Sequence, residues 1–92
     1  MGCLDMQIFY SSQFAREYKQ LPSDIKEKAK KKEKIFRKNQ FDRRLKTHKL
    51  KGKLDEFWAF SVDFHYRIIF KFQDSNTVRF YVIGDYSIYR KL

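Results

Sequence analysis

The sequence is poor in cysteine, proline and glycine. Among its 92 residues there is one cysteine, Cys3, together with one proline and three glycines. One thiol cannot close an internal disulfide, and no cysteine or histidine spacing typical of a zinc site is present, which excludes disulfide-rich and zinc-stabilised small domains. The shortage of proline and glycine leaves little room for long irregular linkers. We therefore expect one domain over residues 1–92, with no metal and no other cofactor.

Long hydrophobic runs are absent as well. No stretch of about 18 apolar residues is present, and the start MGCLDM has no signal-peptide core, so the sequence predicts neither a membrane span nor a secretory signal. Met6 stands where a myristoylation motif has Ser or Thr. A lone thiol suits a reducing compartment, so we expect a cytoplasmic protein with no membrane partner. Met6 could itself be the start, which would make residues 1–5 a dispensable tail.

Acidic residues are too few to balance the basic ones. Lys and Arg total 21 against 11 Asp and Glu, which gives a formal net charge of +10. Small soluble domains usually carry a net charge of about 2 to 8 in magnitude. An excess of this size repels itself unless a polyanion or an acidic partner takes up the field. Nucleic acid is the first candidate partner and an acidic protein the second, while a merely soluble surface is the remaining alternative.

The first part of the chain predicts a strand followed by a helix. Residues 6–10 (MQIFY) alternate and are rich in strand-forming side chains. Ser11 and Ser12 then offer N-caps for an amphipathic helix that ends at Pro22. The spacing i, i+4, i+7 gives this helix an apolar stripe, made of Phe14, Tyr18 and Leu21.

A second helix is predicted from Ser23, as its N-cap, to a stop near Asn39. Its apolar stripe consists of Ile25, Ala29 and Phe36. Lys32 falls on the same line, and we expect its ammonium to reach outwards. Most other positions are lysine, and a lysine-rich helix is more often a solvated face than a binding site.

The last part of the chain predicts strands. Three runs rich in β-branched and aromatic residues cover 57–63, 66–72 and 77–83, and the turn sequences DFH and QDSN separate them. Turns of this length favour an antiparallel meander. The sequence therefore predicts an α+β fold in which an N-terminal strand and a two-helix hairpin pack on one face of an antiparallel sheet.

A strongly basic segment lies between the helices and these strands. In HKLKGKL (48–54) lysines alternate with Leu50 and Leu54, which predicts an edge segment with one anchored and one cationic side. Over 43–53 the cations are Arg43, Arg44, Lys46, Lys49, Lys51 and Lys53. Cations beside exposed rings such as Trp58 suit single-stranded RNA, which offers phosphates to the cations and unstacked bases to the rings. The alternative is that the neighbouring rings are core.

Two further places carry candidate side chains. Arg67 opens the otherwise apolar strand RIIF, so we expect its side chain to face water or a ligand. His65, in the preceding turn, is more typical of a turn residue than of a catalytic base. The tail GDYSIYRKL concentrates polar and aromatic groups, namely Asp85, Tyr86, Tyr89 and Arg90.

Three blocks of the sequence resemble the RelE/ParE toxin superfamily of type II toxin–antitoxin modules. They are MQIFYSSQFAREYKQLP, LKTHKLKGKLDEFWAFSVDFHYRIIF and VIGDYSIYR, which match in order and cover nearly the whole chain. The resemblance implies a strand, two helices and an antiparallel sheet. It also implies a toxin that a cognate antitoxin, encoded beside it and here expected to be acidic, neutralises.

The RelE-like branch implies an endoribonuclease, or mRNA interferase, that cuts messenger RNA on the ribosome and so inhibits translation. Without a metal, an RNA 2′-hydroxyl attacks the adjacent phosphate. The positions that match the family's site place catalysis on His48, Lys49, Lys51, Arg67, Tyr86 and Tyr89. Within this set Arg67 would stabilise the phosphorane, and His48 or a nearby lysine would act as the base. Many relatives have a tail histidine where this chain has Tyr86, so we expect Tyr86 or Tyr89 to stack a base or position the phosphate.

The remaining candidates for RNA binding are Arg43, Arg44, Lys46, Lys53, Trp58 and Arg90. The expected partners are the ribosome, messenger RNA and the antitoxin, with DNA contacted only through the antitoxin. Two other functions stay open. A ParE-like member would poison DNA gyrase and would need no proton-transfer set, and a non-catalytic member would only bind RNA or the antitoxin.

Overall fold

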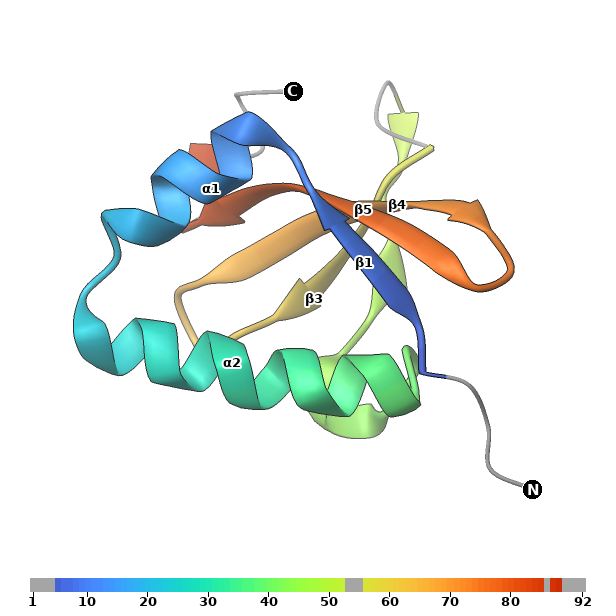
Figure 1. The fold of residues 1–92 in the computed structure, drawn as a ribbon, viewed down its shortest axis with the longest axis horizontal. Helices are drawn as coiled ribbons and strands as arrows, with labels where there is room; N and C mark the ends of the chain where they lie inside the picture. Colours follow the sequence, from blue (N-terminus) through green and yellow to red (C-terminus); the bar gives the residue numbers. More distant parts are fainter. Residues whose placement is uncertain (1–4, 53–55, 86, 89–92) are drawn as a thin grey trace.

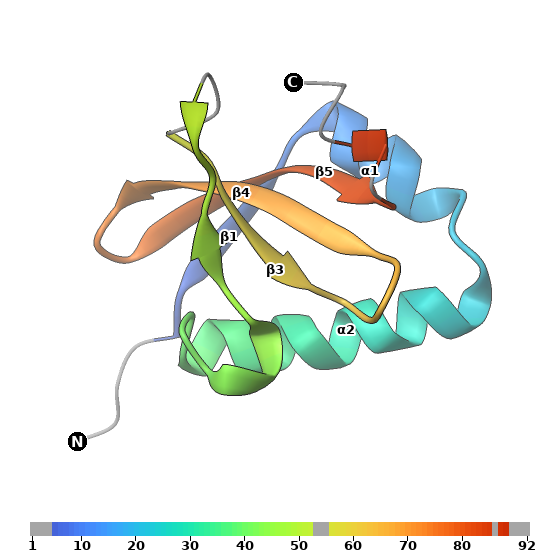
Figure 2. The ribbon, with the colours of Figure 1, turned by 180° about the vertical axis from the view of Figure 1, so that it is seen from behind.

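The computed structural model describes residues 5–52, 56–85, 87 and 88, and within them it shows two helices packed on a sheet of five strands (Figures 1 and 2). The helices are α1 (Ser12–Lys19) and α2 (Ser23–Lys38), followed by a short 3₁₀ turn, η1 (Arg43–Leu45). The strands are β1 (Gln7–Tyr10), β2 (His48–Lys49), β3 (Trp58–Ser61), β4 (Arg67–Asp74) and β5 (Thr77–Gly84). The predicted α+β class is confirmed.

The strands are ordered β1-β5-β4-β3-β2. Strands β2 to β5 pair antiparallel, as the predicted meander requires, and β2 forms one edge of the sheet. β1 lies parallel to β5, with Gln7 opposite Thr77. The sequence prediction of an antiparallel sheet missed this one parallel pair, because nothing in the local pattern of residues 6–10 reports the direction of a distant partner.

Capping explains where the helices begin and end. The Ser11 hydroxyl accepts a hydrogen bond from the N–H of Phe14 at 2.9 Å, so Ser11 is the N-cap of α1. The prediction that Ser23 caps α2 is wrong. Pro22 holds the N-cap position, where its ring has no atom that could accept a hydrogen bond, and Ser23 is the first helical residue. Asn39 ends α2, as expected.

The face of the sheet that α2 covers, here called the helix face, carries the main core. Phe36 of α2 is fully buried, and its ring centroid lies 4.9 Å from Phe60, 4.9 Å from Phe70 and 5.4 Å from Phe80. Fully burying a side chain of this size stabilises the fold by roughly 1.5 to 3 kcal/mol. Phe60, one of the rings that follow the basic segment, is therefore a core residue, as the alternative for these rings predicted.

The opposite side of the sheet, here called the second face, has a smaller apolar cluster of its own. It is formed by Leu50, Ala59, Ile69, Val82 and Ile88, with Phe57 packed against it. Leu50 is buried while Lys49 and Lys51 on either side are exposed, which confirms the predicted anchored side over residues 48–52. Leu54, the second predicted anchor, lies outside the described residues. None of the helices in the described part of the chain is long and apolar enough to cross a membrane.

Helix α1 continues the support of β5 where β1 stops. The backbone N–H of Ser11 donates to the carbonyl of Phe80 at 3.0 Å, and the Ser11 hydroxyl donates to the carbonyl of Tyr81 at 2.8 Å. Further along, the N–H of Ile83 donates to the Glu17 carboxylate at 3.0 Å. These bonds satisfy backbone groups that β1 is too short to reach, and so they fix the end of β5 that borders Arg67.

Gly84 ends β5 beside a tightly packed side chain, and this generates a first prediction. A Cβ at Gly84 would lie 2.5 Å from Cγ2 of Ile88, which is 1% exposed and has little room to move. Gly84→Ala should therefore destabilise the protein by about 1 to 3 kcal/mol, measured by urea unfolding. The double variant Gly84→Ala/Ile88→Ala should lose less unfolding free energy than the sum of the losses of the two single variants. Strict additivity would contradict the proposed clash.

Candidate functional site

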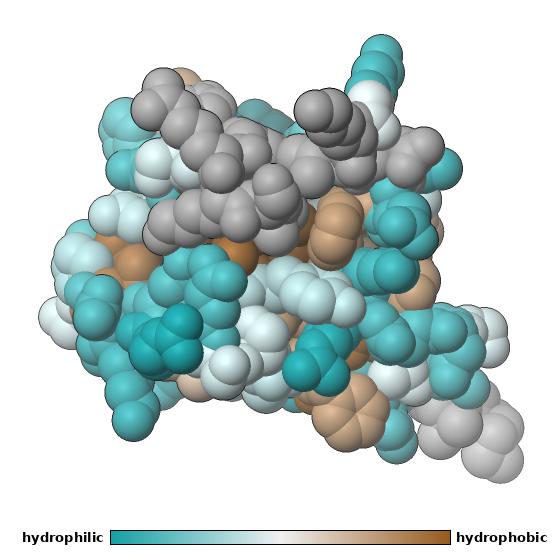
Figure 3. Space-filling model, turned by 90° about the horizontal axis from the view of Figure 1, so that it is seen from above, coloured by the Kyte–Doolittle hydropathy of each residue, from teal (hydrophilic) through white to brown (hydrophobic). Residues whose placement is uncertain are grey.

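Figure 3 views the molecule from the side opposite α2 and so shows the second face, where hydrophobic groups reach the surface among hydrophilic ones. The pairing of residues between neighbouring strands shows which side chains belong to this face. His48 is opposite Ala59, and Ala59 is opposite Ile69, so His48 shares the face of these two apolar residues. Arg67 lies two residues before Ile69 on β4 and therefore projects from the same face. The second face thus brings together two of the predicted catalytic residues.

Arg67 is held by the turn that precedes it. Its Nη1 donates to the backbone carbonyls of Asp63 at 2.6 Å, Tyr66 at 3.1 Å and Phe64 at 3.3 Å. The side chain is half-buried, so of the two expectations, water or a ligand, full exposure to water is not met. One end of the guanidinium closes the β3–β4 turn, and the group is thereby fixed at the rim of the second face.

Asp63 organises the same turn from its other side. Its Oδ1 accepts hydrogen bonds from the N–H groups of His65 and Tyr66, both at 2.9 Å, and its Oδ2 lies 3.4 Å from Lys28 Nζ. Partial burial raises the pKa of the Asp63 carboxyl, but these hydrogen bonds and the Lys28 charge outweigh it and leave the pKa below its ordinary value. His65 is a turn residue, as predicted.

His48 is exposed, and its ring is oriented by the backbone. Nδ1 lies 3.1 Å from the carbonyl oxygen of Lys46, a residue with φ of 53° in the left-handed region. A carbonyl oxygen can only accept, so Nδ1 must carry the hydrogen in this contact. In the neutral ring Nε2 is then unprotonated and free to take up a proton.

Other predicted residues lie elsewhere. Lys49 is opposite Trp58 in the register, so both belong to the helix-face side. Trp58 is half-buried, with its ring centroid 5.6 Å from Phe41 and 5.5 Å from Phe72. The structure thus packs Trp58 against the main core and does not bring it to His48 and Arg67. Successive side chains of a strand point to opposite faces of the sheet, so Trp58 and Ala59 lie on different faces although they are adjacent in sequence.

The two arginines of η1 are also apart from this face. Arg44 donates to both oxygens of Asp42 at 2.9 Å, and its backbone carbonyl accepts from Lys32 Nζ of α2 at 3.0 Å. The Arg44 side chain holds the pKa of the Asp42 carboxyl well below its ordinary range. Arg43 and Lys46 are exposed at the two ends of this turn. The predicted residues Lys53, Tyr86, Tyr89 and Arg90, and residues 1–4 of the predicted tail, lie outside the described residues.

Sequence reasoning missed three side chains of the second face, Lys71, Arg79 and Tyr81. Together with Phe57 they meet through ring–ring and cation–ring contacts. The signal that could have found them is the period of two along a strand: Lys71 follows Arg67 and Ile69, and Tyr81 follows Arg79. The sequences of β4 and β5 are mainly apolar, so the cations at alternate positions, Lys71 and Arg79, were not considered as site residues.

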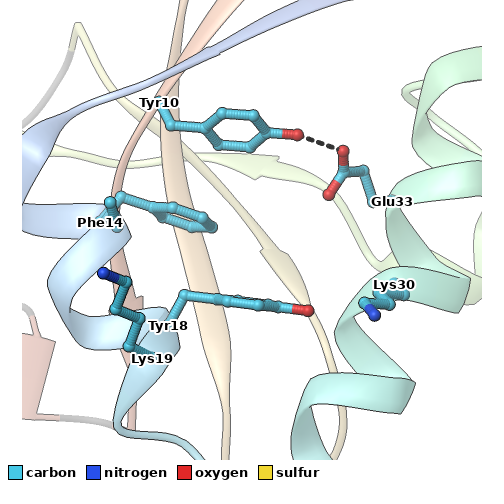
Figure 4. A pocket seen from close by; sticks show the side chains of 7 residues that line it. Tyr10, Phe14, Tyr18, Lys19, Lys30 and Glu33 are labelled. Atoms are coloured by element: carbon cyan, nitrogen blue, oxygen red, sulfur yellow. Dashed lines mark hydrogen bonds between the residues drawn. The ribbon is translucent and has the colours of Figure 1, made fainter.

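A pocket of about 470 Å³ lies on the other side of the molecule, between α1 and α2 (Figure 4). Tyr10, Phe14 and Tyr18 stack along one wall, and Tyr10 donates a hydrogen bond to Glu33. Burial, followed by this bond and the Glu33 charge, raises the pKa of Tyr10 to about 12. The pocket contains none of the predicted site residues. Within the described ranges no group of three or more His, Cys, Asp or Glu is placed to hold a metal ion.

Comparison with known proteins agrees with this architecture. A search of curated proteins found no match. Among solved structures, YafQ from E. coli strain BL21(DE3) has a TM-score of 0.75 and 22% identity, covering 91% of this chain and 97% of YafQ. The YoeB/ParE toxin from Agrobacterium tumefaciens has a TM-score of 0.74 and 13% identity, covering 88% and 99%. The archaeal RelE–RelB complex from Pyrococcus horikoshii OT3 has a TM-score of 0.71 and 14% identity, covering 89% and 96%.

These solved structures share the fold, and the family model carries the assignment further. The model that matches residues 5–86 is the HigB-like toxin, described as the RelE-like toxin of the type II toxin–antitoxin system HigB. The match spans far more than half of the chain and confirms the resemblance seen in the sequence. The chain therefore belongs to the RelE-like toxins of type II toxin–antitoxin systems.

Proposed function

We propose that this toxin is an endoribonuclease that cleaves messenger RNA on the ribosome, in the cytoplasm, and thereby stops translation. The observation that carries the proposal is the placement of His48 and Arg67 on the same face of the sheet. They stand two strands and two residues apart, so strand spacing and rise put their Cα atoms about 12 Å apart. Side chains of their length can then approach one phosphate from two sides.

The proposed reaction uses these groups as base and anion stabiliser. Nε2 of His48 takes the proton from the RNA 2′-hydroxyl, and the resulting oxygen attacks the adjacent phosphorus. The phosphorane carries extra negative charge, which the guanidinium of Arg67 stabilises. The leaving 5′-oxygen takes a proton from an ammonium group of the basic segment. The role needs a fixed guanidinium, and the carbonyl contacts of Arg67 supply that fixity.

The antitoxin is proposed to be an acidic protein that covers the second face. Family membership supports an antitoxin partner, and the archaeal relative was solved as a RelE–RelB complex. The net charge of +10 supports the acidic character. A bound antitoxin would neutralise the cations and block RNA at the same time.

The test of the function is single-turnover cleavage of messenger RNA on programmed ribosomes, with a DNA supercoiling assay beside it. Cleavage at defined positions would support the proposal. Inhibition of supercoiling without cleavage would favour the gyrase-poison alternative. Absence of both effects would leave a non-catalytic binding module.

Arg67→Ala should lose about 10²-fold or more in cleavage rate, because one preorganised donor to the developing charge is removed. Since the side chain also closes the β3–β4 turn, unfolding should become easier by about 1 kcal/mol. Asp63→Ala is the matched control, because it loosens the same turn and keeps the guanidinium. If the two variants lose cleavage equally, the role of Arg67 is structural.

His48→Gln should lose about 10²-fold in the same assay, because the amide cannot accept the proton. The other histidine of the sequence, His65, supplies the control: His65→Gln should cleave at close to the wild-type rate, since His65 belongs to the turn. A His48→Gln enzyme that stays within a few-fold of wild type would transfer the role of base to a lysine.

Lys51→Ala should flatten the salt dependence of RNA binding. Each phosphate that a cation neutralises on a single strand contributes about −0.7 to the slope of log K against log salt, so losing one contact should reduce the slope by about 0.7. Lys31→Ala, which removes an exposed lysine from α2, is the control for net charge. Equal slopes for Lys51→Ala and wild type would remove Lys51 from the RNA-binding site.

A further inference from the structure

The second face continues beyond Arg67 into a cluster of rings and cations that no part of the proposed reaction uses. It consists of Phe9, Phe57, Lys71, Arg79 and Tyr81, here called the aromatic–basic cluster. Lys71 is opposite Arg79 on β5, and Arg79 is opposite Phe9 on β1. Lys71 lies four residues along β4 from Arg67, which corresponds to about 13 Å. The cluster is therefore close to the proposed catalytic residues and distinct from them.

Four of its members, Phe57, Lys71, Arg79 and Tyr81, are in contact with one another. The Phe57 and Tyr81 rings meet edge to face, with centroids 5.3 Å apart. Lys71 Nζ lies 6.0 Å from the Phe57 centroid, and Arg79 Cζ lies 5.8 Å from the Tyr81 centroid. Such cation–ring contacts fix the long side chains, so less rotamer freedom is lost when they bind a ligand.

An irregularity of β5 creates the cluster. The register between β4 and β5 shifts between Ile69, which is opposite Val82, and Phe70, which is opposite Phe80. Tyr81 is the extra residue of this β-bulge, and its ring contact with Phe57 places it on the second face beside Val82. The Ser11 hydroxyl holds the carbonyl of Tyr81 at 2.8 Å, which anchors the bulge to α1.

The exposed members suit a nucleic-acid strand. Phe9 is 55% exposed and offers a ring face, and Arg79 beside it is exposed and offers a guanidinium. Rings on which bases stack, alternating with cations that meet phosphates, form the recognition pattern of single-stranded RNA.

We propose that the aromatic–basic cluster is a second RNA subsite, which binds single-stranded RNA next to the phosphate that is cleaved. This inference rests on the proposed function for its substrate and adds the place where the neighbouring nucleotides lie. Glu56 places one negative charge beside the cations of the cluster. Its Oε1 lies 3.3 Å from Lys71 Nζ, and its side chain is 71% exposed, so it opposes the approach of a phosphate.

The test measures binding of a short, fluorescently labelled single-stranded RNA of mixed sequence to the full chain. Phe9→Ala should weaken binding about fivefold or more, because stacking of one base contributes about 1 to 3 kcal/mol. Arg79→Ala should reduce the salt slope by about 0.7. Glu56→Gln should tighten binding, because it removes a negative charge beside Lys71. Lys34→Ala, an exposed position on α2, controls for net charge, and thermal melts control for folding.

The outcomes separate the subsite from the cleavage reaction. The proposal is overturned if Phe9→Ala and Arg79→Ala both bind RNA like the Lys34→Ala control. It is also overturned if they lose binding to polyglutamate and retain binding to RNA, which would mark a surface for an acidic protein. Cleavage on programmed ribosomes is a separate readout. If the wild type does not cleave while the variants still lose RNA affinity, the proposed catalysis fails and the subsite stands.

Discussion

The fold depends on one side chain of α2, the buried ring of Phe36, which contacts a phenylalanine on each of three neighbouring strands. This contact fixes the position of the helix over β3, β4 and β5 and commits the helix face to packing. The ion pairs of the described residues, such as Lys28–Asp63 and Arg37–Glu33, lie at the surface, where each contributes roughly 0 to 1 kcal/mol. Stability therefore depends far more on the buried apolar side chains around Phe36 than on ion pairs.

The second face shows how the same backbone serves two purposes. Its apolar cluster holds Leu50 of the edge segment against Ile69 and Val82, and the polar residues around that cluster bear the candidate chemistry. Arg67 belongs to both sets, because part of its guanidinium closes a turn while the rest borders the face. A side chain that also forms structural hydrogen bonds is held more rigidly than one whose sole role is to bind substrate. Donors that are fixed in place before the reaction stabilise a charged intermediate best.

Local pattern was enough to predict the α+β class, the strand and helix order, the cap at Ser11 and the edge segment around Leu50. It was not enough to predict which residues share a face. Trp58 and Lys49 stand next in sequence to Ala59 and His48, yet a period of two sends them to the other side of the sheet. Tyr81 and its neighbour Val82 share the second face only because β5 bulges, and a bulge follows from pairing across strands, which a single strand sequence does not reveal.

The parallel pairing of β1 with β5 also bears on how the molecule assembles. Residue 7 pairs with residue 77, and β5 separates β1 from the rest of the sheet, so the sheet is complete only when segments far apart in the chain have met. Contacts of such long sequence separation form late and make folding slow. A chain still being synthesised holds α2 and the basic segment but lacks β5, and with it both the partner strand of Arg67 and the bulge that presents Tyr81. The second face is therefore complete only after this strand has been synthesised and has folded into place.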